Sequence, residues 1–101
     1  MKYTNENLCL LVFSIMKDPS LFKKDFYFNH TKTAHINNTI KSLFSYNELI
    51  ADFRDEIIVI YNKTAQGGNY FSNTTSTFIN LFIRMCEDNK IEYDLVNFFN
   101  N

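Results

Sequence analysis

The chain has 101 residues, the size of one domain, and 46% of them are hydrophobic. This content, which includes eleven Phe and six Tyr, is enough for a packed core and excludes a disordered chain. The formal net charge of −1 argues against a protein that binds nucleic acid through bulk positive charge, and no apolar run is long enough to span a membrane.

Turn-forming residues are scarce, because the chain has only two Gly and one Pro. Sheets and barrels usually need such residues about every 8–12 positions, whereas helices can be joined by short polar connections. We therefore expect an all-α fold, in which residues 1–101 form a single helical domain, a compact bundle of four to five helices.

The first helix is expected at about Asn5–Lys17, with Asn5 as its cap and an acid, Glu6, in its first turn. It is apolar almost all round, which predicts a place in the core or at an interface. Pro19 ends this helix, because the residue before a proline avoids the helical region. A short helix is expected to follow at about Pro19–Asp25.

The middle of the chain predicts two more helices, the first at about Thr33–Phe44. Ser45 and Glu48 have the spacing of a capping box, which would begin the clearest helix. Helical spacing then continues over five turns through Tyr46, Leu49, Ile50, Phe53, Ile57, Ile60, Tyr61 and Thr64. The alternative is a strand at Glu56–Tyr61, which the β-branched residues there permit, but the capping box and the long helical spacing favour the helix.

The last third begins with Gly67 and Gly68, which are expected to end the preceding helix. A fourth helix is expected at about Asn73–Asp88, where the apolar residues again follow helical spacing. A short helix at about Glu92–Phe99 would complete the bundle.

Cys9 and Cys86 each lie within an apolar run, which predicts buried free thiols; a disulfide between them is the alternative. Nothing in this cysteine usage indicates an oxidising compartment, and we expect a soluble, cytoplasmic protein. His30 and His35 are five residues apart and do not form a pair on one helix face, so no zinc site is predicted. No nucleophile motif or phosphate-binding loop is present, and we expect no enzyme, no catalytic residue, no metal and no cofactor.

The charge divides unevenly along the chain. Residues 1–45 have six basic and three acidic residues (+3), whereas residues 46–101 have four basic and eight acidic residues (−4). An acidic surface of this kind suits a basic protein partner. The predicted partner-binding residues are Glu48, Asp52, Asp55, Glu56, Glu87 and Asp88, with Glu92 and Asp94 nearby in sequence.

The composition also suggests a source, because Asn, Lys, Ile, Phe and Tyr supply 49 of the residues and all have A/T-rich codons. Such DNA is common in phages, mobile islands and some bacteria. The first hypothesis is therefore a small protein-binding inhibitor, an immunity protein that occludes the active surface of a bacterial toxin such as a nuclease. A phage-encoded inhibitor of a host defence complex is the alternative within this class.

Two hypotheses come from other classes. A small nucleic-acid-binding regulator would use lysines interleaved with aromatic residues, although nucleic acid is the less favoured partner. Its residues would be Lys17, Lys23, Lys24, Lys32 and Lys41, with Phe26, Tyr27 and Phe28. A self-assembling protein, or homo-oligomer, would use the apolar first helix as its interface.

Overall fold

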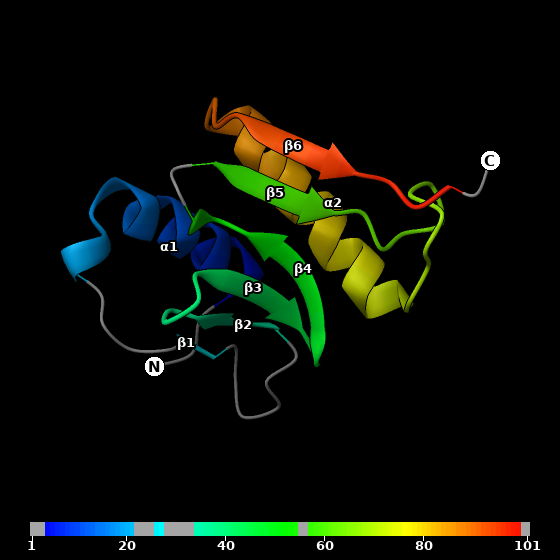
Figure 1. Cartoon of the computed structure of the whole chain (residues 1–101), viewed down its shortest axis with the longest axis horizontal. Coiled ribbons are helices and arrows are strands. Elements are labelled where there is room, and N and C mark those ends of the chain that lie inside the picture. The colour runs from blue at the N-terminus through cyan, green and yellow to red at the C-terminus, as the bar shows by residue number, and fades with distance from the viewer. Residues whose placement is uncertain (1–3, 22–25, 28–33, 55–56, 100–101) are drawn as a thin grey trace.

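The computed structural model describes residues 4–21, 26–27, 34–54 and 57–99. Within these ranges the chain forms two α-helices and a six-stranded mixed sheet, which is an α+β fold (Figure 1). The predicted all-α bundle of four to five helices is therefore wrong.

The two helices have the bounds that the sequence predicted: α1 is Asn5–Lys17 and α2 is Asn73–Asp88. Thr4, and not Asn5, caps α1, because its side chain accepts a hydrogen bond from the backbone N–H of Asn7 at 3.1 Å. Ser72 caps α2 in the same way, by accepting from Thr75. A single 3₁₀ turn, η1 (Pro19–Leu21), stands where a short helix was expected, and residues 22–25 lie outside the described residues.

The remaining elements are strands. They are β1 (Phe26–Tyr27), β2 (Ala34–Asn37), β3 (Ser42–Ser45), β4 (Glu48–Asp52), β5 (Ile58–Tyr61) and β6 (Tyr93–Val96). They lie in the sheet in chain order, with antiparallel neighbours from β1 to β5. β6 is parallel to β5, because α2 carries the chain back across the sheet before β6 begins.

The predicted helix at Thr33–Phe44 is wrong, because residues 34–44 belong to a hairpin of β2 and β3; Thr33 lies outside the described residues. The side chain of Asn37 supplies its turn by accepting hydrogen bonds from the backbone N–H groups of Thr39 and Ile40. Lys41 then has a positive φ of 56°. The chain therefore turns here without glycine, and this is why the scarcity of glycine did not exclude a sheet.

The predicted helix after Ser45 is also wrong. Ser45 and Glu48 are cross-strand partners at the end of the β3–β4 hairpin, and Tyr46 in the two-residue loop has φ 55°. The alternative of a strand in this segment is correct, because β5 occupies Ile58–Tyr61 with alternating burial. The helix expected at Glu92–Phe99 is likewise replaced by β6, which pairs with β5.

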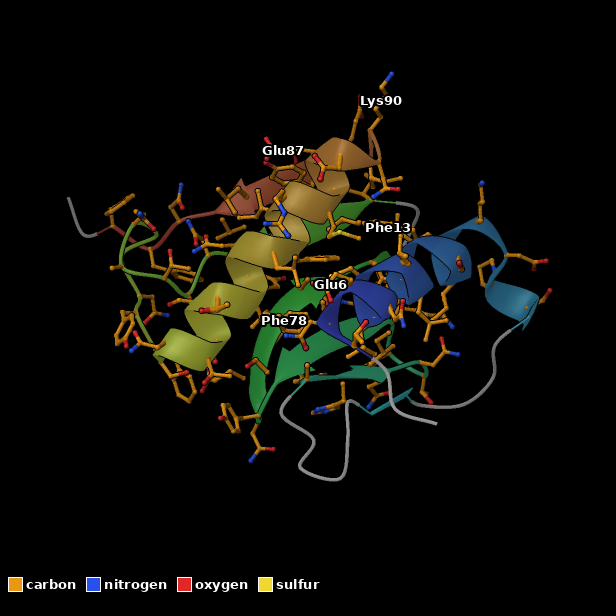
Figure 2. The ribbon with its side chains drawn as sticks, turned by 180° about the vertical axis from the view of Figure 1, so that it is seen from behind. Glu6, Phe13, Phe78, Glu87 and Lys90 are labelled. Carbon is orange, nitrogen blue, oxygen red and sulfur yellow. The ribbon has the colours of Figure 1, made fainter. Side chains whose placement is uncertain are left out.

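Both helices cover the same face of the sheet: they lie behind it in Figure 1 and in front of it in Figure 2, and they contact each other. The core lies between these two layers. Its fully buried side chains include Leu8, Val12, Ile15, Ile36, Leu43, Ile50, Ile58, Ile60, Ile79 and Phe82. The ring of Phe13 stacks on Phe82 with centroids 6.1 Å apart, which joins the two helices. The apolar α1 is thus a core helix.

Cys9 and Cys86 are also buried in this core, and both are free, as the sequence predicted. Polar contact between the layers comes from Ser45 and Thr75, whose buried hydroxyl oxygens lie 2.8 Å apart. In the described part of the chain, no helix is long and apolar enough to cross a membrane.

The segment after β6 is fixed to the loop after β5. The Asn62 amide donates to the Asn97 side chain at 2.8 Å, and the backbone N–H of Phe98 donates to the Gly67 carbonyl at 2.6 Å. Gly68, at φ 84°, has a conformation that suits glycine. Gly67 and Gly68 thus shape the connection from β5 to α2, and they do not end a helix as expected.

Candidate functional site

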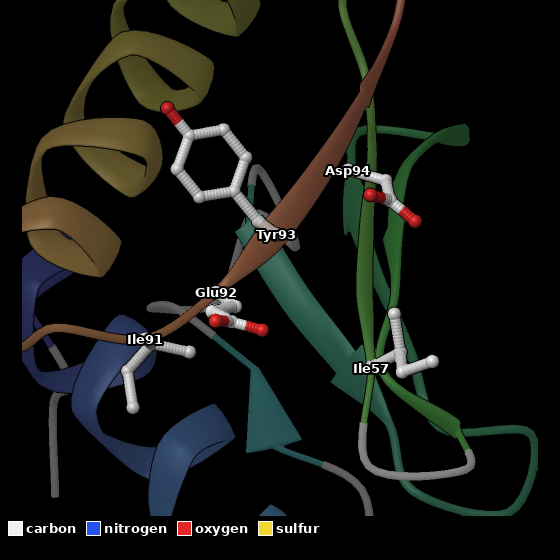
Figure 3. Close-up of a pocket in the computed structure, with 5 residues that line it drawn as sticks. All are labelled: Ile57, Ile91, Glu92, Tyr93 and Asp94. Carbon is white, nitrogen blue, oxygen red and sulfur yellow. The ribbon is translucent and has the colours of Figure 1, made fainter.

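Two neighbouring hollows lie beside β5 and β6. One has a volume of about 440 Å³ and is lined by Ile57, Ile91, Glu92, Tyr93 and Asp94 (Figure 3). The other has a volume of about 320 Å³ and is lined by Asp52, Arg54, Ile57, Val59, Tyr61 and Asp94. The hollows share Ile57 and Asp94, and we call the two together the β6 groove.

The strand pairing positions the groove residues. Val59 pairs with Asp94 and Ile58 pairs with Tyr93. Because side chains alternate along a strand, Asp94 and Val59 share one face of the sheet while Tyr93 and Ile58 share the other. In Figure 3 the Tyr93 ring points toward α2 and the Asp94 carboxylate points away from it. The groove therefore combines the open face of the sheet with the beginning of β6.

Ile57 is the apolar centre of the groove. It directly precedes β5 and 54% of it is exposed, although the next residue, Ile58, is fully buried. A single exposed isoleucine is ordinary on a protein surface. Here, however, it lines both hollows together with carboxylates of different strands. The groove thus combines an exposed apolar side chain with acidic ones.

Asp52 is held in place at one end of the groove. Its carboxylate accepts hydrogen bonds from the hydroxyls of Ser42 and Tyr61, the latter at 2.9 Å, and lies 3.8 Å from the Arg54 guanidinium. The pKa of Tyr61 is raised, chiefly because its hydroxyl donates to this carboxylate. These contacts hold the Asp52 carboxylate in one position at this end of the groove.

Glu92 and Asp94, at the other end, are exposed, and within the described part of the chain no cation pairs with either. Tyr93 lies between them in sequence. Burial, with the nearby Glu87 carboxylate contributing, raises the pKa of its phenol. The exposed acids of this end are therefore available to an external cation.

The structure separates the acidic residues that the sequence grouped together. Glu48 forms an ion pair with Lys63 at 3.0 Å, outside the groove, while Asp52 lies within it. Asp55 and Glu56 lie outside the described residues. Glu87 and Asp88 are exposed at the end of α2, where Figure 2 labels Glu87. The single acidic helix face expected over residues 48–56 does not exist, because residues 48–52 form a strand.

Sequence reasoning missed the apolar and basic members of the groove, namely Ile57, Val59, Tyr93 and Arg54. A strand at Glu56–Tyr61 would have placed Val59 and Tyr61 on one face, so the alternative interpretation held part of the signal. Nothing local to the sequence would have indicated that Asp94 lies beside Val59, since that pairing depends on the crossover through α2.

The other predicted chemistry can be located only in part. The His35 ring stacks on Phe44, with centroids 5.1 Å apart, and His30 lies outside the described residues. No group of three His, Cys, Asp or Glu side chains in the described ranges could hold a metal ion. Burial raises the pKa of both Cys9 and Cys86 to about 12, so these thiols stay protonated at neutral pH and are poor nucleophiles.

The lysines proposed for nucleic acid do not form a described surface. Lys17 is exposed at the end of α1, and the Lys41 ammonium donates to the Asn38 side chain. The remaining members of that set lie outside the described residues or have only their backbone described: Lys23, Lys24, Lys32, Phe26, Tyr27 and Phe28.

Comparison with known protein families gives a match over most of the chain. The model of a family of unknown function (DUF8033) matches residues 17–97, a segment that contains the whole sheet, α2 and the β6 groove. No curated protein and no solved structure matches the chain.

Proposed function

The chain belongs to this family of unknown function (DUF8033), and from its geometry we propose that it is a protein-binding module that holds a basic, partly apolar segment of a partner protein in the β6 groove. The observation that carries the proposal is the exposed Ile57, which lines the same hollow as Asp52 and Asp94.

Charge supports a basic partner. The groove has three carboxylates, from Asp52, Glu92 and Asp94, and one cation, from Arg54. An interface gains specificity and association rate when such a surface meets the opposite charge. A partner that carries Lys or Arg would restore charge balance, and an apolar side chain on Ile57 would supply buried area at the centre.

Binding of this kind would make the module an inhibitor, because a protein seated on a basic surface excludes the natural ligands of that surface. The inhibitor expected from the sequence thus stays a prediction. Toxin immunity and defence blocking are narrower predictions, and neither the fold nor the family favours one over the other. A cytoplasmic setting is part of the proposal and is supported by the free thiols Cys9 and Cys86.

Charge reversal in the groove tests this proposal. A photo-crosslinking residue at position 57 would capture the partner in the native cell, and affinity for the purified partner would then be measured. Asp94→Lys should weaken binding by at least about tenfold, since it places a cation against a basic segment.

The matched control is Glu6→Lys, which makes the same change of charge on α1, away from the groove (Figure 2). It should leave the affinity unchanged, and circular dichroism should show that both variants are folded. Equal affinity of the two variants for the captured partner would refute the groove as the binding site.

A further inference from the structure

The outer edge of β6 has unpaired backbone groups. β6 is the last strand of the sheet and pairs only with β5 among the described strands. The backbone N–H of Asn62 donates to the Val96 carbonyl at 2.9 Å, so the N–H and C=O of Val96 face β5. Because these groups alternate in direction along a strand, those of Tyr93 and Leu95 face the outside. Two donors and two acceptors therefore line the free edge.

In the described part of the chain this edge has only part of the usual protection against a further strand, namely its short length and the charge of Asp94. Natural edge strands are often blocked by Lys, by Pro, by a bulge or by being very short. β6 has the sequence Tyr-Asp-Leu-Val, which contains neither Lys nor Pro, and it pairs with β5 in unbroken register. The opposite edge of the sheet, β1, is only two residues long.

We infer that the partner segment of the proposed function docks as an extended strand added to the free edge of β6, with basic side chains beside Asp94 and apolar side chains beside Leu95. The inference rests on the proposed function, and it adds a second contact next to the groove, because Asp94 lies both in the groove and on the edge strand. Strand addition of this kind derives affinity from backbone hydrogen bonds and specificity from alternating side chains.

The two faces of β6 define this alternating pattern. Asp94 lies on the open face of the sheet. Every second side chain of an added strand would point to this same face, and the nearest of them would lie beside Asp94. On the helix face lies Leu95, which pairs with the buried Ile60 and yet is 40% exposed. An apolar residue of an added strand would cover Leu95, and a Lys or Arg on the next residue would reach Asp94.

The wider charge around the edge agrees with a basic strand. Residues 87–94 contain four acids and one lysine, a net charge of −3. Their acids are Glu87, Asp88, Glu92 and Asp94, all exposed, and the lysine is Lys90. An acidic strand would be repelled here, so the charge selects among extended segments that could otherwise form the same backbone bonds.

A defined peptide tests the inference. The probe is acetylated Lys-Val-Lys-Val-Lys-Val-amide, with the Glu-Val peptide of the same length as the charge control. Titration followed by NMR should shift the amide resonances of Tyr93 and Leu95 with the lysine peptide and not with the glutamate peptide. No binding of the lysine peptide, or equal binding of both, would overturn the inference.

Backbone pairing is tested by two variants of one residue. Leu95→Pro removes an N–H that faces outward and takes part in no bond to β5, so the sheet should persist. Leu95→Thr keeps that N–H while it removes the apolar side chain. The proline variant should bind the lysine peptide at least about tenfold more weakly than the threonine variant. Equal affinities of the two variants would overturn the inference.

A second test needs no variant of the protein. If the valines lie beside Leu95, the valine N–H groups face β6 in an antiparallel strand and the lysine N–H groups face β6 in a parallel strand. Methylation of the valine nitrogens should therefore block the antiparallel strand, and methylation of the lysine nitrogens should block the parallel one. One of the two methylated peptides should lose binding and the other should keep it. Equal affinities of the two methylated peptides would overturn strand addition.

The same variants separate this inference from the proposed function. If the captured partner loses affinity for Asp94→Lys but binds the proline and threonine variants equally, the groove binds its partner without strand addition. If Asp94→Lys has no effect, the proposed function itself fails.

Discussion

The two buried thiols predict a loss of stability at alkaline pH. Burial raises the pKa of Cys9 from 9.0 to about 12, with the neighbouring Cys86 and Glu6 contributing, and burial together with Glu87 does the same for Cys86. In the unfolded chain both thiols are exposed to water and ionise near the ordinary value. The folded and unfolded states therefore bind different numbers of protons between about pH 9 and pH 12.

The sign follows from proton linkage. Above the unfolded pKa the unfolded chain has released both thiol protons and the folded chain has kept them, so the free energy of unfolding falls as the pH rises. Below that pKa both states are protonated and the thiols contribute no pH dependence. For each thiol, the free energy of unfolding should then fall by about 1.4 kcal/mol per pH unit. Together they should remove roughly 3 kcal/mol between pH 8 and pH 10.

The assay is urea unfolding at pH 8 and pH 10 under a reductant, followed by circular dichroism. The reference is the double variant Cys9→Ala/Cys86→Ala, which keeps every other titrating group, including Tyr61 and Tyr93 with their raised pKa values. The variant loses some packing at both pH values, so only the change in the difference between the two proteins is informative. The expected change is easily measured, because the free energy of unfolding of a domain of this kind is typically only about 5–15 kcal/mol.

The reasoning would be refuted by a constant difference. If the wild-type protein and the double variant lose the same stability between pH 8 and pH 10, the thiols ionise as easily in the folded protein as in the unfolded chain. The space between α1 and α2 would then be wet, in conflict with the complete burial of Cys9 and Cys86.

Two further predictions concern the contacts that position the layers and the last strand. Thr75→Val should lower the free energy of unfolding by about 1–3 kcal/mol, because it leaves the buried Ser45 hydroxyl without its partner. Adding Ser45→Ala should recover part of this loss, which a double-mutant cycle measured by urea unfolding would show. Gly67→Ala should lower the melting temperature by several degrees, a loss of about 1–3 kcal/mol in the free energy of unfolding. The reason is that the new Cβ would lie 1.9 Å from the Asn62 carbonyl oxygen. An unchanged melting temperature would contradict this close approach.

The helices could be predicted because their signals are local. α1 and α2 each combine a polar cap with an apolar face that repeats at helical spacing, and both signals lie within the segment itself. The sheet was missed for an equally physical reason. Its turns place Lys41 and Tyr46 at positive φ, where glycine or asparagine is more usual. The turn residue Asn37 is only a weak signal in a chain with fourteen asparagines.

The Ser45–Glu48 pair shows how one spacing can fit two structures. A capping box places its two residues three apart, and a two-residue hairpin loop separates its flanking cross-strand partners by the same distance. Burial decides between them here. The hydroxyl of Ser45 is oriented toward Thr75 on α2, a contact 30 residues away that no local pattern contains.

The arrangement of the acidic residues also depends on contacts between distant segments, and the predicted binding role of these residues stays a prediction. Asp52 and Asp94 were both recognised as members of an acidic surface, but helix geometry would have kept them apart. They come to line one hollow because β4, β5 and β6 are adjacent. The order of strands in a sheet depends on the whole chain, and the sequence of a single segment does not specify it.

The parallel pairing of β5 and β6 also sets an order of events as the chain folds. The strands from β1 to β5 form from neighbouring segments, whereas the bond between Asn62 and Asn97 closes a separation of 35 residues. Such a contact is slow to form, because the entropy of closing the loop is lost before the contact stabilises the chain. Until α2 has docked and brought β6 into place, β5 is itself the exposed edge of the sheet. The newly made chain is therefore most open to pairing with other chains in the interval before its last strand arrives.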